Sequence, residues 1–71
     1  MTAADIKRSI TIAGHRTSIS LEPEFWTALQ RLAKSRATSL AAMVAEIDQI
    51  RGERNLSSAI RVAILQDLLA P

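Results

Sequence analysis

The strongest constraint on the fold of this chain is a change in the spacing of its apolar residues at Pro23. Before Pro23, apolar and polar residues alternate with a period of two, as Ile10 with Ile12 and Ile19 with Leu21 show. After it, apolar residues recur every three to four positions, which is the period of an amphipathic helix. The sequence therefore predicts strands in the first third of the chain and helices in the rest.

The two alternating runs predict strands at about residues 8–13 and 16–21, joined by a tight turn. A two-residue turn with Gly14 as its first central residue is a type II′ turn, and loops of three or four residues are alternatives. With the type II′ turn, Ile10 pairs with Ile19, and one face of the hairpin is mostly apolar. The opposite face is then rich in hydroxyl groups.

Three helices are predicted after the strands, at about residues 23–35, 39–51 and 56–69. The third is apolar on nearly every side, and a helix of this kind is buried. A single small domain over residues 1–71 offers too little protein to surround such a helix, so we expect a homodimer. The alternative is a helix that packs on its two neighbours and leaves an apolar side exposed. Residues that favour a helix N-terminus stand at each predicted start: Pro23, then Thr38 or Ser39, then Asn55 or Ser57.

The composition excludes several kinds of function. The chain has no Cys, one His and two Gly, which leaves no disulfide, no Cys-based zinc site and no glycine-rich phosphate loop. It also lacks the Gly-x-Ser-x-Gly motif of serine hydrolases. We therefore expect no catalytic residues, no metal and no cofactor. Without an apolar run of about 20 residues or a secretory signal, we expect a cytoplasmic protein without a membrane partner.

The net charge of +2 falls entirely within residues 1–21, where Lys7, Arg8 and Arg16 outnumber Asp5. A localised basic segment can bind nucleic acid, and the alternative is a solvated basic end on an ordinary domain. Within the second predicted strand, Arg16, Ser18 and Ser20 alternate to one face. A two-stranded ribbon fits the major groove of DNA, where Arg and Ser side chains can contact base edges. The alternative is a strand whose polar face is merely hydrated.

The stretch from Lys7 to Trp26 resembles a family of small bacterial proteins with a ribbon-helix-helix domain, in the MetJ/Arc superfamily. The stretches 39–48 and 54–61 resemble the same family, and the resemblance covers about residues 7–69. It implies an α+β, mainly α fold in which a strand or hairpin is followed by two or three helices, in an intertwined homodimer. The resemblance also implies a β-ribbon formed between the two subunits. The implied function is sequence-specific DNA binding by a small transcriptional regulator, with the polar face of this ribbon in the major groove.

The resemblance also implies roles for individual residues. The base-reading positions fall on Arg16, Ser18 and Ser20. The superfamily binds a phosphate at the start of the helix after the turn, which is the second predicted helix or the third. The candidates for phosphate contacts at these helix starts are Thr38, Ser39, Ser57 and Ser58. Lys7 and Arg8 are further candidates for phosphate contacts because of their charge, independently of the resemblance. The apolar pattern of the chain gives the candidates for the dimer core, which are Ile19, Leu21, Ile60, Ile64 and Leu68.

A protein-interaction module, such as an antitoxin-like or scaffold dimer that does not bind DNA directly, is the alternative function. The superfamily usually has one strand and two helices, whereas this chain predicts two strands and three helices. A solitary strand paired across a dimer favours DNA binding. A first strand folded over the second favours protein binding or a structural role.

Overall fold

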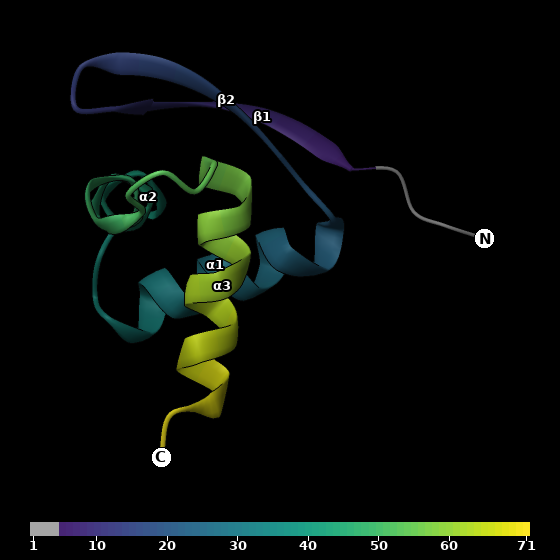
Figure 1. Ribbon diagram of the computed structural model, residues 1–71. Coiled ribbons are helices and arrows are strands. Elements are labelled where there is room, and N and C mark those ends of the chain that lie inside the picture. The colour runs from purple at the N-terminus through teal and green to yellow at the C-terminus, as the bar shows by residue number, and fades with distance from the viewer. Residues whose placement is uncertain (1–4) are drawn as a thin grey trace.

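The computed structural model describes residues 5–71 as a β-hairpin packed on three helices (Figure 1). The predicted order of a hairpin followed by helices is confirmed. Residues 1–4, which belong to the predicted domain and to the segment considered for a secretory signal, lie outside the described range. The elements are β1 (Ile6–Ile12), β2 (His15–Leu21), α1 (Pro23–Ser35), α2 (Leu40–Ile50) and α3 (Leu56–Leu69).

The hairpin turn differs from the predicted one. Ile12 pairs with His15, so the two central turn residues are Ala13 and Gly14. Both have positive φ values, 50° and 80°, as in a type I′ turn. The predicted type II′ turn is wrong because it placed Gly14 first, and an alanine with positive φ is uncommon. Every cross-strand pair therefore shifts by two residues, which leaves each side chain on its predicted face.

One apolar core lies between the hairpin and the three helices. Because the inward face of the hairpin supplies four of its residues, the hairpin is an integral part of the domain. The buried residues are Ile10 and Ile12 of β1, Ile19 and Leu21 of β2, Trp26, Leu29, Leu32 and Ala33 of α1, Met43, Val44 and Ile47 of α2, and Ala59, Ile60 and Ile64 of α3.

Trp26 links α1 to the start of β1 through a hydrogen bond. Its side chain is 2% exposed and belongs to the core. The indole Nε1 donates a hydrogen bond to the carbonyl oxygen of Ile6 over 2.8 Å. The guanidinium carbon of Arg8 lies 5.1 Å from the centroid of the ring, within the range of a cation–π contact.

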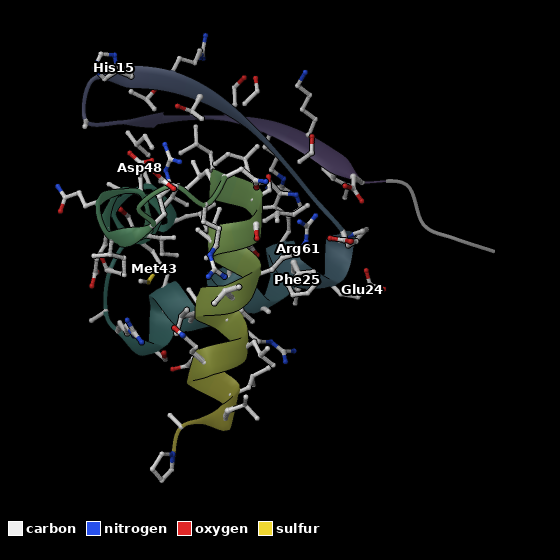
Figure 2. All side chains as sticks on the ribbon, viewed as in Figure 1. His15, Glu24, Phe25, Met43, Asp48 and Arg61 are labelled. Carbon is white, nitrogen blue, oxygen red and sulfur yellow. The ribbon has the colours of Figure 1, made fainter. Side chains whose placement is uncertain are left out.

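Arg61 of α3 makes a second link to the hairpin (Figure 2). Its Nε donates to Oε1 of Glu22 over 2.9 Å, and its Nη2 lies 3.8 Å from Oδ2 of Asp5. The guanidinium also lies over the ring of Phe25, 5.7 Å from the centroid. A backbone hydrogen bond, together with the bond from Arg61, holds the pKa of Glu22 below its usual value. Arg61 therefore joins α3 to the junction of β2 and α1 and to the residue before β1.

The two halves of α3 have different surroundings. The first half begins close to the hairpin and contributes Ala59 and Ile60 to the core (Figure 1). Ile64, just past the midpoint of the helix, is the last buried residue of α3. In the second half, Leu65 is 53% exposed, and Leu68 and Leu69 are each 74% exposed. The single chain therefore surrounds only part of this helix. No helix within residues 5–71 is long and apolar enough to span a membrane.

Candidate functional site

The face of the hairpin that points away from the helices is polar, and we call it the polar face. Figure 2 shows side chains projecting from this side of the hairpin into solvent. Five of its six residues are exposed and Ser20 is half-buried. The polar face consists of Lys7, Ser9 and Thr11 from β1 and Arg16, Ser18 and Ser20 from β2.

The register places these residues in three cross-strand pairs: Lys7 with Ser20, Ser9 with Ser18, and Thr11 with Arg16. Directly opposed side chains on one face have their Cβ atoms about 4.5–5.5 Å apart. Along each strand, alternate residues stand about 6.6 Å apart. The polar face is therefore a compact grid with hydroxyl groups at its centre. Lys7 occupies one corner, and Arg16 occupies the diagonally opposite corner beside the turn.

The hydrogen-bonding groups on the side chains of the polar face are available to bind a partner. None of the side-chain hydrogen bonds or ion pairs recorded within residues 5–71 involves any of its six side chains. The face holds two cations and no carboxylate, together with four hydroxyl groups that can each donate and accept. Such a surface suits a partner that is negatively charged and rich in hydrogen-bonding groups.

The three predicted base-reading residues, Arg16, Ser18 and Ser20, lie together on the polar face. The structure adds Ser9 and Thr11, which the sequence analysis did not single out. The sequence did contain a signal for these two residues, since both belong to the period-two alternation of β1. β1 lies beside β2 in one sheet and does not fold over its polar side, so the predicted reading residues stay uncovered.

The predicted phosphate-contact residues do not form one group. Lys7 lies on the polar face, whereas its neighbour Arg8 lies on the opposite face of β1, over the ring of Trp26. The polar face therefore has one of the two predicted basic side chains of β1.

The remaining phosphate candidates lie at two helix N-termini that are already partly capped. Before α2, Oγ of Ser39 accepts a hydrogen bond from the amide of Ala42 over 3.0 Å. At α3, Oδ1 of Asn55 accepts from the amide of Ser58 over 2.8 Å. Ser57 and Ser58 are half-buried, and so is Thr38, whereas Ser39 is exposed.

Four of the five predicted dimer-core residues are buried within the single chain. Ile19, Leu21 and Ile60 are at most 1% exposed, and Ile64 is 4% exposed. Leu68 alone faces solvent, at 74% exposure. A second copy that binds the folded chain can therefore reach Leu68 but not the other four.

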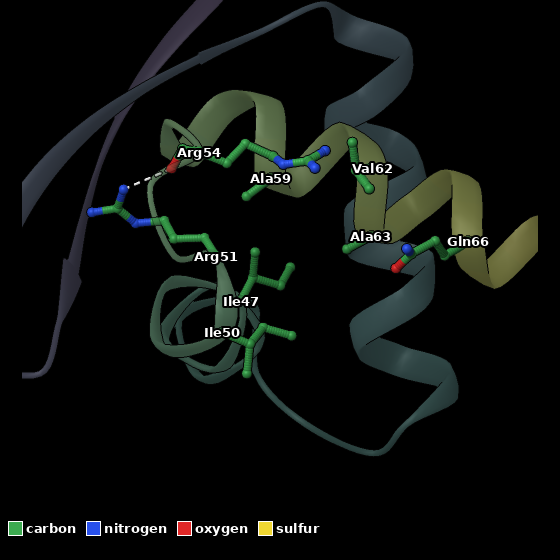
Figure 3. A pocket seen from close by; sticks show the side chains of 8 residues that line it. All are labelled: Ile47, Ile50, Arg51, Arg54, Ala59, Val62, Ala63 and Gln66. Carbon is green, nitrogen blue, oxygen red and sulfur yellow. Dashed lines mark hydrogen bonds between the residues drawn. The ribbon is translucent and has the colours of Figure 1, made fainter.

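A shallow pocket of about 180 Å³ lies between α2 and α3 (Figure 3). Its wall is largely aliphatic, with Ile47 and Ile50 on one side and Val62 on the other. Arg51 stands at its edge, where it pairs with Asp48 and donates to the carbonyl oxygen of Arg54. Among the described residues that line it, none is Ser, Cys, His, Asp or Glu, so this pocket offers no nucleophile or general base.

A model of the ribbon-helix-helix domain family matches residues 5–68. The match covers both strands, α1, α2 and α3 up to its penultimate residue. Searches among curated proteins and among solved structures return no match.

Proposed function

Because the chain belongs to the ribbon-helix-helix domain family, we propose that it binds double-stranded DNA sequence-specifically as a homodimer and regulates transcription. Proteins with this domain commonly bind DNA as dimers. The observation that supports the proposal is the polar face, with its two cations, its four hydroxyl groups and no carboxylate. This domain is typically a regulatory rather than an enzymatic fold, and we propose no catalytic activity.

The polar face fits the chemistry of the major groove. A two-stranded ribbon is narrow enough to enter a groove about 12 Å wide. Arg16 can donate two hydrogen bonds to O6 and N7 of a guanine, and the hydroxyl groups of Ser18 and Ser20 can contact several base edges. Lys7, at the far corner of the face, is placed to contact a phosphate, which adds affinity without sequence preference.

Two kinds of surface on the described chain remain open to a second copy. The sheet has two strands, so the outer edge of β2 and that of β1 are both without a paired strand within residues 5–71. The second half of α3 exposes Leu65, Leu68 and Leu69. We propose that the homodimer uses one of these surfaces, since the four other predicted dimer-core residues already belong to the core of one chain.

The proposal is tested by selecting preferred duplexes from a random pool and titrating them in mobility-shift assays. Arg16→Ala should weaken binding to the preferred duplex by about 1–3 kcal/mol and relax the preference at one position of each half-site. Arg31→Ala is the matched control, because it removes the same charge from an exposed site on α1. Equal binding to all duplexes, or equal effects of the two variants, would contradict the proposal.

A protein-interaction module is the second candidate, favoured by the exposed leucines of α3 and by Ile50, which is 76% exposed beside the α2–α3 pocket. Exposed apolar patches of this kind mark contacts with other proteins. This candidate predicts no binding to any duplex in the random pool at low salt. It also predicts that Arg16→Ala leaves every interaction of the protein unchanged.

A further inference from the structure

The pocket between α2 and α3 combines aliphatic walls with a cation at one end. We propose that it binds a small aliphatic molecule with a single carboxylate group, and that Arg54 holds this carboxylate. The inference does not depend on the proposed DNA binding, because none of the residues of the polar face lines the pocket.

The pocket continues into a second hollow of about 230 Å³ along the same two helices. The two hollows share Ile47, Ile50, Ala63 and Gln66 as lining residues, so together they form one groove, which we call the α2–α3 groove. Ala59 and Ala63 lie four positions apart on one face of α3, where their small side chains leave room. Since a water molecule occupies about 30 Å³ in the liquid, the groove has room for a chain of several carbon atoms.

The wall of the groove on α2 suits an aliphatic chain. Ile47 is 2% exposed and lies deep in this wall, whereas Ile50, which also lines the groove, is 76% exposed. An aliphatic chain bound in the groove would cover Ile50. Each methylene group that the chain buries there tightens binding by up to about fourfold.

Arg54 gives one end of the groove a positive charge. Its side chain extends beside α3 towards Val62 (Figure 3). None of the side-chain hydrogen bonds, ion pairs or cation–π contacts recorded within residues 5–71 uses its guanidinium group. This group can therefore donate two parallel hydrogen bonds to a carboxylate.

Arg51 holds the backbone of Arg54 in place. Nη1 of Arg51 donates to the carbonyl oxygen of Arg54 over 2.8 Å, and its Nε donates to Oδ1 of Asp48 over 2.6 Å. The amide of Arg54 donates in turn to the carbonyl oxygen of Arg51 over 3.2 Å. Because Asp48 already neutralises Arg51, the charge of Arg54 is the one without a carboxylate among the described residues that line the pocket.

The other end of the groove limits the ligand to one carboxylate. Glu46 and Asp67 line the second hollow, and Arg36 pairs with Asp67 over 3.6 Å. A second carboxylate at the far end of the ligand would meet the charge of Glu46. A monocarboxylate that places its charged group at Arg54 and its chain along the groove avoids this repulsion.

The inference is tested by calorimetric titration of the full chain with octanoate, octanamide and octanedioate. These three probes have the same chain length and carry one carboxylate, none and two. We expect octanoate to bind once per chain and the other two to bind about fivefold or more weakly. Each methylene group removed from octanoate should weaken binding by up to about fourfold.

Two variants with matched controls test the two ends of the ligand. Arg54→Ala should weaken octanoate binding about fivefold or more and remove the preference for octanoate over octanamide, whereas Arg31→Ala, on exposed α1, should change neither. Ile50→Ala should weaken octanoate binding severalfold. Leu69→Ala removes a side chain that is 74% exposed and lies outside the groove, so it should have no effect. Superimposable thermal unfolding curves would show that the variants keep the fold.

Amide NMR signals of the isotope-labelled chain show where octanoate binds, and we expect those of Ala63 and Gln66 to shift. No binding of octanoate, equal binding of octanoate and octanamide, or equal effects of Arg54→Ala and Arg31→Ala would overturn the inference. If the same signals shift when the protein concentration alone is raised, a second copy covers the groove and the inference is wrong. The proposed DNA binding is measured separately, so it stands or falls independently of these results.

Discussion

The polar face of the hairpin and the outward side of α3 are both exposed, and their chemistry is opposite. The hairpin presents hydroxyl groups and two cations, which water solvates well. The second half of α3 presents Leu65, Leu68 and Leu69, and burying one leucine fully is worth about 1.5–3 kcal/mol. The first surface can remain hydrated between binding events, whereas the second gains free energy whenever it is covered. We therefore expect a partner of the hairpin to bind reversibly and a partner of α3 to stay bound for longer.

The largest expected effect is on stability, at one of two neighbouring positions of α3. Ile64 is buried and Leu65 is exposed. Ile64→Asp places a charge in the core and should lower the free energy of unfolding by more than about 4 kcal/mol, enough to unfold the chain. Leu65→Asp should cost about 1 kcal/mol or less, because this side chain is half exposed.

Leu65→Asp should nevertheless prevent self-association through α3. Urea unfolding measures the first effect and sedimentation velocity the second. A Leu65→Asp protein that is folded and sediments as the unaltered protein does would show that this surface holds no second copy. Self-association would then not explain why the leucines of α3 are exposed.

Trp26 provides the next largest effect, because the comparison assumes that the hairpin is fixed to the helices. Trp26→Ala should cost about 3–5 kcal/mol of stability through the cavity that it leaves. Trp26→Phe retains an aromatic ring but leaves the carbonyl oxygen of Ile6 without its donor, at a cost of about 1–3 kcal/mol. Thermal and urea unfolding measure both. Equal stability of Trp26→Phe and the unaltered protein would show that the hydrogen bond does not hold β1.

Most of the fold could be predicted because its signals are local. The change of period at Pro23 separates strands from helices, and each helix starts beside a residue that favours an N-terminus. The turn could not be predicted, because Ala13 adopts a positive φ that its residue type does not indicate. The surroundings of α3 were predicted in part. An apolar helix signals burial, but the sequence does not show how much of it one chain can cover.

Substitutions of Lys7 and Arg8 test the role of the polar face, with smaller expected effects than those above. These two neighbours lie on opposite faces of β1. Lys7→Ala should lower the slope of log K against log salt by about one for each chain that loses a phosphate contact. Arg8→Ala should leave that slope unchanged and cost about 0.5–1 kcal/mol of stability through the lost contact with Trp26. Titrations at several salt concentrations measure the slopes. A lower slope for Arg8→Ala would show that this side chain leaves the indole to reach DNA.

The smallest effect concerns the pair of Glu22 and Arg61. A backbone hydrogen bond, and after it the bond from Arg61, hold the pKa of Glu22 in the folded chain below its usual value of 4.5, so ionised Glu22 contributes stability above pH 4.5. This contribution is lost as the pH falls through the lowered pKa. Glu22→Gln should therefore flatten the dependence of stability on pH below 4.5, as measured by urea unfolding at a series of pH values.

Glu24→Gln is the matched control for Glu22→Gln, since it removes a carboxylate of the same turn and leaves the Arg61 pair intact. The contribution of Glu22 to the pH dependence should persist in this variant. If stability falls with pH below 4.5 in Glu22→Gln as steeply as in the unaltered protein, ionised Glu22 does not stabilise the folded chain.

The candidate site could be predicted from the sequence only along β2. Alternation placed Arg16, Ser18 and Ser20 on one face whatever the turn, because a shift of two residues preserves the face. Which residue of β1 lies opposite each of them depends on the turn, and so does the pairing of Ser9 with Ser18. The role of Arg8 was assigned from its charge alone, and its place over Trp26 depends on how α1 packs against the sheet.

The position of α3 in the chain has a consequence for the order of folding. The hairpin pairs residues that are at most 15 positions apart, so it can form early. Its inward isoleucines stay incompletely covered until Ala59, Ile60 and Ile64 arrive with the final helix. During synthesis, a chain that has not yet produced α3 exposes an apolar sheet with free edges, the kind of species that aggregates. We therefore expect rapid docking of α3 to limit aggregation of the newly made protein.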